Sequence, residues 1–438
     1  MKTVFVRDLL ANPAGVDVSL SAWVATRRKG GNVVFLDLVD STGKIQAIFD
    51  RSQVGPEVFV LAETVPTESA IHIRGRLETR PQNPHDIRAH TMELIGADEL
   101  RLSPQPRTAR NVFDSGLADH VLHNRHLYIR NPKSMAILRF RSALMSYVRS
   151  WFEANNFLEI DAPVLTAVPL YEDGSAVSLQ INDETVYLTQ CVGYYLEAAV
   201  HAFERVYNMG PSFRGEESRS KRHLMEYWHI KAEIAFADLD DIIGIVESVI
   251  SMVSRQCWAL QSDVAKILGT SMCLDGMELP FPRISYEEAA RQLRADGFAF
   301  EFGTNLGSAE EAALSRQFQQ PFWITGIPRT IEPFPYVIDP DDPRVTRVAD
   351  LIATNGYGEL LGVAEKISST AMLDERMQEK GKFQDPRYEW IRDVHRSGCV
   401  PHAAFGMGLE RLIRWLLNIE HVRDAAAFPR IFRRRIFP

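Results

Sequence analysis

Short runs that alternate apolar and polar residues fill the first hundred positions and constrain the fold more than any other feature. VDVSLSAWVAT, NVVFLDLVD, KIQAIFD and AIHIRGRLE keep this period of two, with KGGN and STGK as turns between them. A period of two matches a β strand, in which successive side chains point to opposite faces. Five or so short strands separated by turns are typical of a small Greek-key barrel.

The segments that follow predict an α+β fold, with an OB-fold barrel at 1–100 ahead of a larger body. RLSPQPRTARNVFDSG contains two prolines and little periodicity, which predicts a linker at 101–120. From Pro132 to Asn155, apolar residues recur at helical spacing. FLEIDAPVLT predicts a strand that runs into Pro163, YGELLGVAEKI predicts another strand, and GMGLERLIRWLLN predicts a helix. We expect the amphipathic helices at about 240–320 to carry little chemistry.

The composition is that of an ordinary globular protein and argues against several functional classes. Apolar residues make up 45% and charged residues 24%, and the net charge is −8, so a nucleic-acid contact needs a local basic patch. The four cysteines form no C-x-x-C pair, which disfavours a disulfide framework or a zinc site and favours a reducing cytoplasm. The N-terminus lacks the apolar core of a signal peptide, and no run of about 18 apolar residues predicts a membrane span.

A dense run of charges, FRGEESRSKRHLMEYW at 213–228, lies between the strand-like segments RVYNMGPSF and HIKAEIAFADL. Arginines on neighbouring strands with a loop between them can hold a polyphosphate through paired N–H donors. Arg214 and Glu216 lie two positions apart in a predicted strand and therefore share a face, while Tyr227 is suited to stack on a purine. The alternative is a solvated loop with surface ion pairs.

Two glycine-containing segments add candidate ligands. In AFGMGLERLIRW (404–415), Gly408 precedes a helix whose first amides favour an anion, and Arg411 lies near the helix start. In ADLIATNGYGELLG (349–362), Asp350 and Glu359 flank a glycine turn and are natural Mg²⁺ ligands beside a phosphate. Taken singly, these residues are equally typical of a helix entry, a capping Asp and a surface Glu.

The order of these segments resembles the three signature motifs of class II aminoacyl-tRNA synthetases. FLEIDAPVLT resembles motif 1, FRGEESRSKRHLMEY resembles motif 2 and GMGLERL resembles motif 3. RHLYIRNP, SRSKRHLMEYWHIKAE, YEWIRDVHRSG and HVRDAAAFPR resemble the aspartyl/asparaginyl branch, and its asparaginyl members more than the aspartyl ones. The resemblance covers nearly all of 16–438 and is weakest over 255–330. It implies a catalytic domain at 121–438, an antiparallel sheet flanked by helices, with a helical insertion at about 240–320.

This resemblance assigns the ATP half of an active site. It implies Arg214 on the α-phosphate of ATP and Arg411 on the γ-phosphate, both as catalytic residues. Arg222 and His223 would close over the outer phosphates, and Tyr227 would stack on adenine. Fixed cations suit this reaction because negative charge grows on the phosphoryl oxygens and on the leaving pyrophosphate.

The same resemblance implies Mg²⁺ as a cofactor beside ATP. Asp350 and Glu359 match the metal carboxylates of the family, and both are present. Glu216, Glu359 and Gly408 complete the implied ATP-binding set.

The amino-acid half departs from the family pattern. TQCVG, which contains Gln190, has Gly193 where the family has a glutamine that contacts the substrate. GELLGVAEK has Lys366 in place of the arginine that reads the substrate side chain, and HAAFG, which begins at His402, replaces HGGYG. Glu172 matches the glutamate that binds the amino group. These changes predict weak activation of asparagine; the alternative is drift within a diverse family.

The barrel resembles the anticodon-binding domain of the same branch. Phe35 and Gln46 match its usual aromatic and amide, with Arg27 or Arg28 beside them. Stacking and hydrogen bonding on such a face read unpaired bases. The alternative for Phe35 is a place in the barrel core.

The sequence therefore predicts an enzyme that uses ATP and Mg²⁺ to activate asparagine, or a close analogue, as an aminoacyl adenylate and to transfer it to tRNA. The expected partners are tRNA, the amino acid and a second copy in a homodimer formed through the motif 1 region, in the cytoplasm and without a membrane. The alternatives are a paralogue that passes the adenylate to a non-tRNA acceptor in small-molecule biosynthesis and a non-catalytic tRNA-binding protein.

Overall fold

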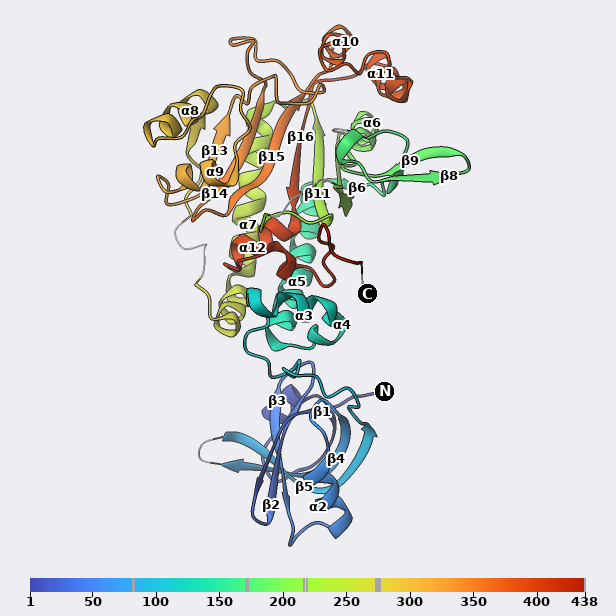
Figure 1. Cartoon of the computed structure of the whole chain (residues 1–438), viewed down its shortest axis with the longest axis vertical. Coiled ribbons are helices and arrows are strands. Elements are labelled where there is room, and N and C mark those ends of the chain that lie inside the picture. The colour runs from blue at the N-terminus through green and yellow to red at the C-terminus, as the bar shows by residue number, and fades with distance from the viewer. Residues whose placement is uncertain (81–82, 170–172, 216, 218–219, 272–276, 437–438) are drawn as a thin grey trace. The chain divides into compact units, whose positions relative to one another are not determined.

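Two compact units, Met1–Met135 and Ala136–Pro438, make up the computed structural model (Figure 1). The structure describes residues 1–80, 83–169, 173–215, 217, 220–271 and 277–436. Each unit buries apolar side chains of its own.

Five strands of the first unit close into a barrel in the order β1-β2-β3-β5-β4, which confirms the barrel predicted from the alternating runs. The strands are β1 (Asp17–Gly30), β2 (Val33–Val39), β3 (Lys44–Asp50), β4 (Ala70–Arg80) and β5 (Asn83–Gly96). Helices α1 (Val6–Ala11) and α2 (Pro56–Thr64) add apolar residues to the barrel core. Because side chains alternate across each strand, every second residue faces this core.

The segment after the barrel builds a small core of its own. It contains the short helices η1 (Ser115–Leu117), α3 (Ala118–His123) and α4 (Arg125–Tyr128). Val112, Val121 and Tyr128 are buried together there, and the Tyr128 hydroxyl donates to the Pro104 carbonyl oxygen at 2.5 Å. Residues 101–120, predicted as a linker, thus include part of this packed helical segment.

The second unit is built around an eight-stranded sheet with the order β12-β13-β14-β15-β16-β11-β10-β6. Its strands are β6 (Leu158–Glu159), β10 (Arg205–Phe213), β11 (Glu226–Ala235), β12 (Arg283–Ser285), β13 (Phe322–Thr325), β14 (Val348–Ala353), β15 (Gly358–Lys366) and β16 (His402–Gly408). All central pairs are antiparallel, and the edge pairs β12–β13 and β6–β10 are parallel. The α+β body with a largely antiparallel sheet is confirmed.

Helices cover this sheet and extend from its edges. They are α5 (Pro132–Ala154), α6 (Gly193–Phe203), α7 (Leu239–Leu268), α8 (Tyr286–Ala295), α9 (Ser308–Ser315), α10 (Thr370–Glu379), α11 (Glu389–Arg396) and α12 (Leu409–Leu416), with the 3₁₀ turns η2 (Asp173–Ser175), η3 (Pro386–Tyr388) and η4 (Val422–Ala425). A small second sheet has the order β7-β9-β8, with β7 (Leu165–Thr166), β9 (Glu184–Leu188) and β8 (Ser178–Ile181).

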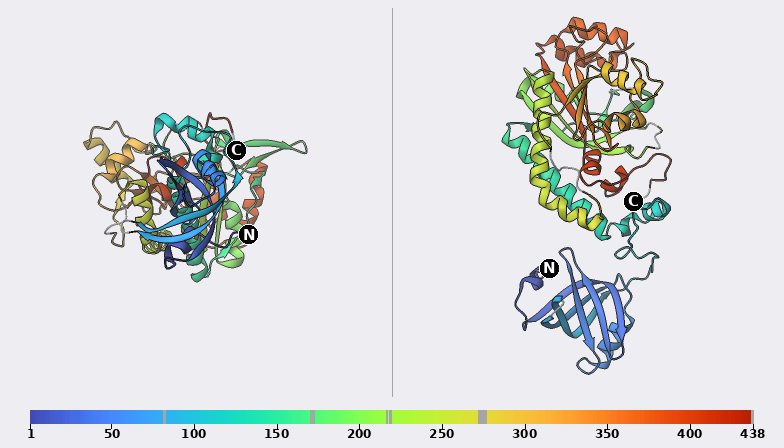
Figure 2. Two further views of the ribbon diagram at one scale, coloured as in Figure 1. Left: turned by 90° about the horizontal axis from the view of Figure 1, so that it is seen from below. Right: turned by 90° about the vertical axis from the view of Figure 1, so that its left-hand side faces the viewer.

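Helix α7 is the long helix that lies along one face of the sheet (Figure 2). The Asp238 carboxylate caps its first turn by accepting from the amides of Asp240 and Asp241, and Gly269 ends it with a φ of +74°. By length and composition α7 could cross a membrane, although its sequence contains no unbroken apolar run of that length. Half of its most apolar stretch is buried inside the protein, where Ile242, Val246 and Ile250 are among the buried residues.

The strand predicted at FLEIDAPVLT is shorter than expected. β6 covers only Leu158–Glu159, and the amide of Ile160 still donates to the Tyr207 carbonyl oxygen at 2.8 Å. The chain then leaves the sheet before Pro163, which has no N–H to continue the ladder.

We predict that replacing Gly75 with alanine destabilises the barrel. A Cβ at this position would lie 2.3 Å from the Arg88 carbonyl oxygen and 2.8 Å from the Ala89 Cα, at an irregularity in the β4–β5 register. Both obstacles are backbone atoms, so the strands must separate, at a cost of about 1–3 kcal/mol or more. The measurement is thermal unfolding of the full chain, with Gly96→Ala as the matched control, because a Cβ there would meet nothing within 4 Å. Equal unfolding temperatures for the two variants would contradict the prediction.

Candidate active site

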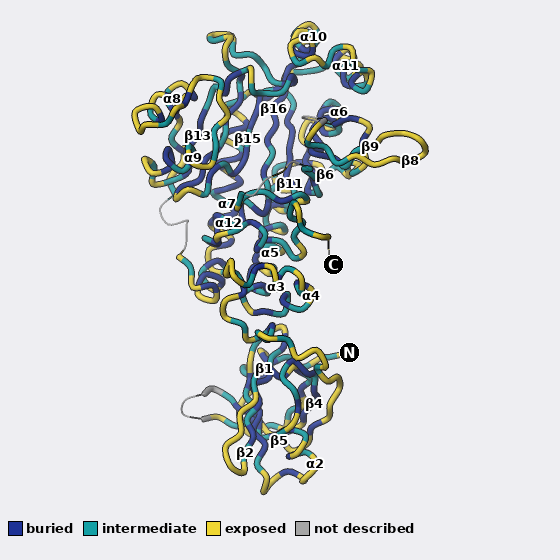
Figure 3. Tube along the Cα trace, viewed as in Figure 1, coloured by how far each residue is buried: buried dark blue, intermediate teal, exposed yellow. Residues whose placement is uncertain are grey.

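A row of four residues across the central sheet forms the floor of a cavity. Lys231 on β11 pairs with Gly406 on β16, Gly406 with Gly362 on β15, and Gly362 with Asp350 on β14. All four residues line the cavity, and the strands around them are the buried centre of the unit (Figure 3). The two middle positions have no side chain and give room to their neighbours, because a Cβ at Gly406 would lie 2.7 Å from the His229 Nε2 and one at Gly362 would lie 2.9 Å from the Asp350 carboxylate.

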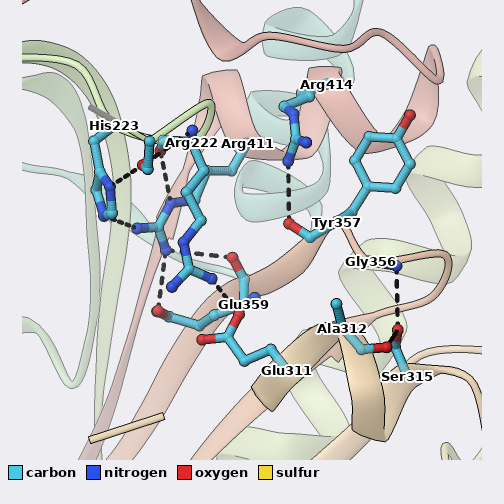
Figure 4. A network of polar contacts seen from close by, with 11 residues as sticks. Arg222, His223, Glu311, Ala312, Ser315, Gly356, Tyr357, Glu359, Arg411 and Arg414 are labelled. Atoms are coloured by element: carbon cyan, nitrogen blue, oxygen red, sulfur yellow. Dashed lines mark hydrogen bonds and ion pairs between the residues drawn. The ribbon is translucent and has the colours of Figure 1, made fainter. Parts of the chain in front are cut away.

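One end of this cavity, here called the arginine end, is formed by Arg214, Arg222, His223 and Arg411. Arg214 directly follows β10 and its guanidinium lies 5.9 Å from the centre of the Tyr227 ring on β11. The Arg411 guanidinium, carried by the first turn of α12, forms an ion pair with Glu359 at 3.1 Å (Figure 4). The hairpin of β10 and β11 and the start of α12 therefore bring the charged run and the GMGLERL segment together, as the sequence predicted.

His223 is a neutral member of this cationic group. Burial, followed by the positive charges of Arg411 and Arg222, lowers the pKa of His223 to about 4. Its Nε2 accepts from the Arg411 guanidinium at 3.3 Å, so the proton lies on Nδ1, which faces the Ser220 hydroxyl. A neutral imidazole can thus orient Arg411 without adding a like charge.

Glu311 on α9 is a residue of this site that sequence reasoning missed. It forms an ion pair with Arg222, and its carboxylate accepts from the Glu359 amide at 2.9 Å (Figure 4). The expectation that residues 240–320 carry little chemistry is therefore wrong at this position. Gly358 makes the contact possible, because it has a φ of +80° and a Cβ there would lie 2.4 Å from the Glu311 carboxylate. A glycine just before Glu359 was the only local signal.

Several carboxyl groups crowd the floor beside the arginines. Burial, and then the negative charges of Glu359, Glu332 and Glu311, raise the pKa of Asp350 well above its ordinary value. Burial and the charge of Glu359 also raise the pKa of Glu332 to about 7. A bound cation would relieve this repulsion, and carboxylate oxygens are the ligands that Mg²⁺ prefers. The residues present therefore fit a Mg²⁺ ion held by Asp350 and Glu359.

The opposite end of the cavity, here called the lysine end, is formed by Lys231, Lys366 and Tyr336. The Lys366 ammonium lies 2.9 Å from a Glu197 oxygen and 3.5 Å from a Glu233 oxygen, and all three side chains are at least 97% buried. Burial alone would lower the pKa of Lys366, but the charges of Glu197 and Glu233 raise it above its ordinary value. Lys366 is thus tied to two carboxylates of the protein itself.

Lys231 is the second residue that sequence reasoning missed. It alternates with His229 and Glu233 along β11, and both Lys231 and His229 line the cavity. In the sequence it is one charge in HIKAEIAF, and only the structure shows that it lines the cavity, opposite Gly406 on β16. A lysine inside an otherwise buried strand is the signal that was available.

Most of the predicted site residues line one cavity. Those that do are Arg214, Arg222, His223, Tyr227, Asp350, Glu359, Lys366, Gly408 and Arg411. Glu172 and Glu216 lie outside the described residues.

Three residues predicted to bind the amino acid do not line the cavity. Gln190 is buried and its side-chain amide donates to the Ser175 hydroxyl at 2.8 Å, while its backbone carbonyl oxygen accepts from the Tyr227 hydroxyl at 3.4 Å. His402 is fully buried, and its Nδ1 donates to the Val400 carbonyl oxygen at 2.8 Å. Gly193 begins α6, packed against the Lys231 side chain. The pattern showed these positions without showing which way they face.

A second group of predicted residues lies on the outer face of the barrel. Phe35 is half-buried and stays outside the barrel core, with the Arg28 guanidinium 5.9 Å from its ring centre. Gln46 donates to the Asp37 carboxylate at 3.3 Å, and Arg28 lies 3.6 Å from the same group. The barrel-core alternative for Phe35 is therefore wrong, and an aromatic, an amide and a cation meet on one face. Arg27 instead donates to the Val65 carbonyl oxygen at 2.6 Å.

Comparisons with known proteins match both the barrel and the larger unit to known families. Residues 118–431 match the family model of class II tRNA synthetases (D, K and N), and residues 18–95 match that of the OB-fold nucleic acid binding domain. The asparagine–tRNA ligase of Pyrococcus abyssi is 35% identical over 440 residues and is covered completely, as is this chain.

Solved structures show the same architecture. The crystal structure of asparaginyl-tRNA synthetase from Pyrococcus horikoshii complexed with asparaginyl-adenylate has a TM-score of 0.93 and 34% identity, over 99% of both chains. The asparaginyl-tRNA synthetase of Entamoeba histolytica has a TM-score of 0.85 and 25% identity, over 98% of both chains. The family model and the full-length relatives give the same assignment. The chain belongs to the class II tRNA synthetases of the D, K and N group.

Proposed function

We propose that this chain activates asparagine, or a close analogue, with ATP and transfers the acyl group to tRNA. The observation that carries the proposal is the single cavity with arginines at one end, carboxylates beside them and lysines at the other end. Its similarity to a structure that contains asparaginyl-adenylate supports the same reaction.

The arginine end suits the chemistry of adenylate formation. The substrate carboxylate would attack the α-phosphorus while pyrophosphate leaves, and negative charge would grow on the oxygens around Arg214 and Arg411. Because Arg411 is already oriented by Glu359 and His223, little reorganisation is needed when that charge forms. Tyr227, near the start of β11, lines the cavity and offers a ring on which a purine can stack.

Asp350 and Glu359 would hold Mg²⁺ beside the phosphates. When bound, the ion would supply positive charge that neutralises the phosphate oxygens. Gly362 supports this role, because a Cβ there would lie 2.9 Å from the Asp350 carboxylate and restrict it.

The barrel face suits an unpaired base of tRNA. Phe35 offers a ring, Gln46 an amide and Arg28 a cation, the combination by which such barrels hold single strands. We further infer a cytoplasmic homodimer that uses the region around β6 and β7. Leu158 and Leu165 support this interface, since each is 46% exposed and offers apolar surface to a partner.

A paralogue with a non-tRNA acceptor remains the second candidate, because the lysine end departs from the family pattern at Gly193 and Lys366. The arginine and carboxylate groups argue against a non-catalytic tRNA-binding protein, since a binding module has no use for them inside a cavity.

Adenylate chemistry should depend on the arginine end. We expect Arg214→Ala and Arg411→Ala each to lower the rate of ATP–pyrophosphate exchange by about 100-fold or more, because each removes about 3 kcal/mol of transition-state stabilisation. Arg255→Ala, which removes an exposed guanidinium on α7, is the matched control and should leave exchange unchanged. Near-normal exchange in both cavity variants would overturn the ATP assignment.

The barrel face should affect tRNA charging without affecting activation. Phe35→Ala should weaken charging by about 1–3 kcal/mol, the value of one stacked base, while pyrophosphate exchange stays unchanged. Phe236→Ala removes a phenylalanine that is 70% exposed on the second unit and serves as the control. An equal loss of charging and exchange in Phe35→Ala would show instead that the ring only stabilises the protein.

A further inference from the structure

Lys231 lines the lysine end of the cavity, and its side chain lies next to Gly193. Lys231 is buried, with 6% of the residue exposed, and it lies at one end of the row that continues through Gly406 and Gly362 to Asp350. Lys231 lines the cavity at the end of this row away from Asp350, and Lys366 lines the same cavity.

Gly193 leaves the space that Lys231 fills. A Cβ at residue 193 would lie 3.1 Å from the Lys231 Nζ and 3.3 Å from its Cε. Both distances are shorter than an ordinary carbon contact, so a larger side chain at 193 would have to displace the ammonium. Residue 193 and Lys231 thus form one unit, in which the missing side chain of one makes room for the cation of the other.

Lys231 and Lys366 differ in the carboxylates that surround them. Within the described part of the chain, Lys366 has carboxylates at ion-pair distance and Lys231 has none. Burial raises the pKa of Glu233 and the charge of Lys366, 3.5 Å away, opposes that rise, so this carboxyl belongs with Lys366 rather than with Lys231. Glu197 and Glu233 therefore compensate Lys366, whereas Lys231 lines the cavity with the Cys191 thiolate as its anionic partner.

The pKa of the Cys191 thiol shows that the surroundings of Lys231 stabilise negative charge. Burial raises the pKa of a thiol, yet the charge of Lys231 and a hydrogen bond with His229 hold the pKa of Cys191 well below its ordinary value. A place that favours a thiolate over a thiol favours other anions as well. A bound anionic group would compete with the thiolate for Lys231.

We propose that Lys231 is a specificity-determining residue and that the cavity prefers an amino acid whose short side chain ends in a carboxylate over one that ends in an amide. An ammonium has three donors and no acceptor, so it satisfies a carboxylate but offers nothing to the N–H groups of an amide. The resulting hydrogen bond is charge-assisted and buried. This inference rests on the proposed function, since it names the side-chain chemistry that the same site selects.

The test is ATP–pyrophosphate exchange by the full chain with aspartate and with asparagine as probes. We expect kcat/KM for aspartate to exceed that for asparagine by about tenfold or more in the unaltered protein, which corresponds to one charged hydrogen bond. Lys231→Gln, which is neutral and offers both a donor and an acceptor, should shift the ratio toward asparagine and leave the KM for ATP unchanged. Lys266→Met, which removes an exposed lysine on α7, is the matched control and should keep the original ratio.

The outcomes separate the two proposals. Exchange with asparagine in preference to aspartate overturns the role of Lys231 and leaves the proposed function in place. A ratio that Lys231→Gln does not change has the same effect, because a merely structural lysine would alter both substrates equally. Exchange with no amino acid at all overturns the proposed function together with this inference. If Lys231→Gln fails to fold, as thermal unfolding would show, the ratio in the unaltered protein still decides.

Discussion

The register of four antiparallel strands determines what this active site can contain. β11, β16, β15 and β14 place one residue each in a row, and the two middle residues are glycines. A shift of one residue in any pair would turn the lining side chains toward the opposite face of the sheet. The arginine end, the carboxylates and the lysine end all depend on this register, because each is carried by these strands or by a segment that starts from them.

The periodicity of apolar residues predicted the strands and helices that depend on neighbouring residues of the sequence. The period of two in residues 1–100 predicted the barrel, and helical spacing after Pro132 predicted α5. The residues of the arginine end were also predictable, because the charged run and the GMGLERL segment each keep their members close in sequence. Glu311 and Lys231 were not, since what makes each of them part of the site is a contact with a distant segment.

Buried charge explains why this site is costly to alter. Lys366 and Glu197 are each at least 97% buried, and His395 lies 2.7 Å from the second oxygen of Glu197. Removing one member of such a group leaves the others without compensation, whereas a surface pair can be lost with little effect. The two ends of the cavity differ in how their cations are compensated. The arginines lie beside carboxylates that also suit a metal ion, whereas Lys366 lies beside the buried carboxylates of Glu197 and Glu233.

The contact between Gly193 and Lys231 also limits the routes by which this pocket can change. A side chain longer than hydrogen at 193 meets the ammonium first, so its effect depends on whether Lys231 is still present. The two positions should therefore show epistasis, so that the effect of a larger residue at 193 depends on which residue stands at 231. A mutational library that varies one position at a time would miss the functional combinations. Laboratory evolution toward another amino acid should therefore reach larger residues at 193 more readily when codon 231 varies in the same library.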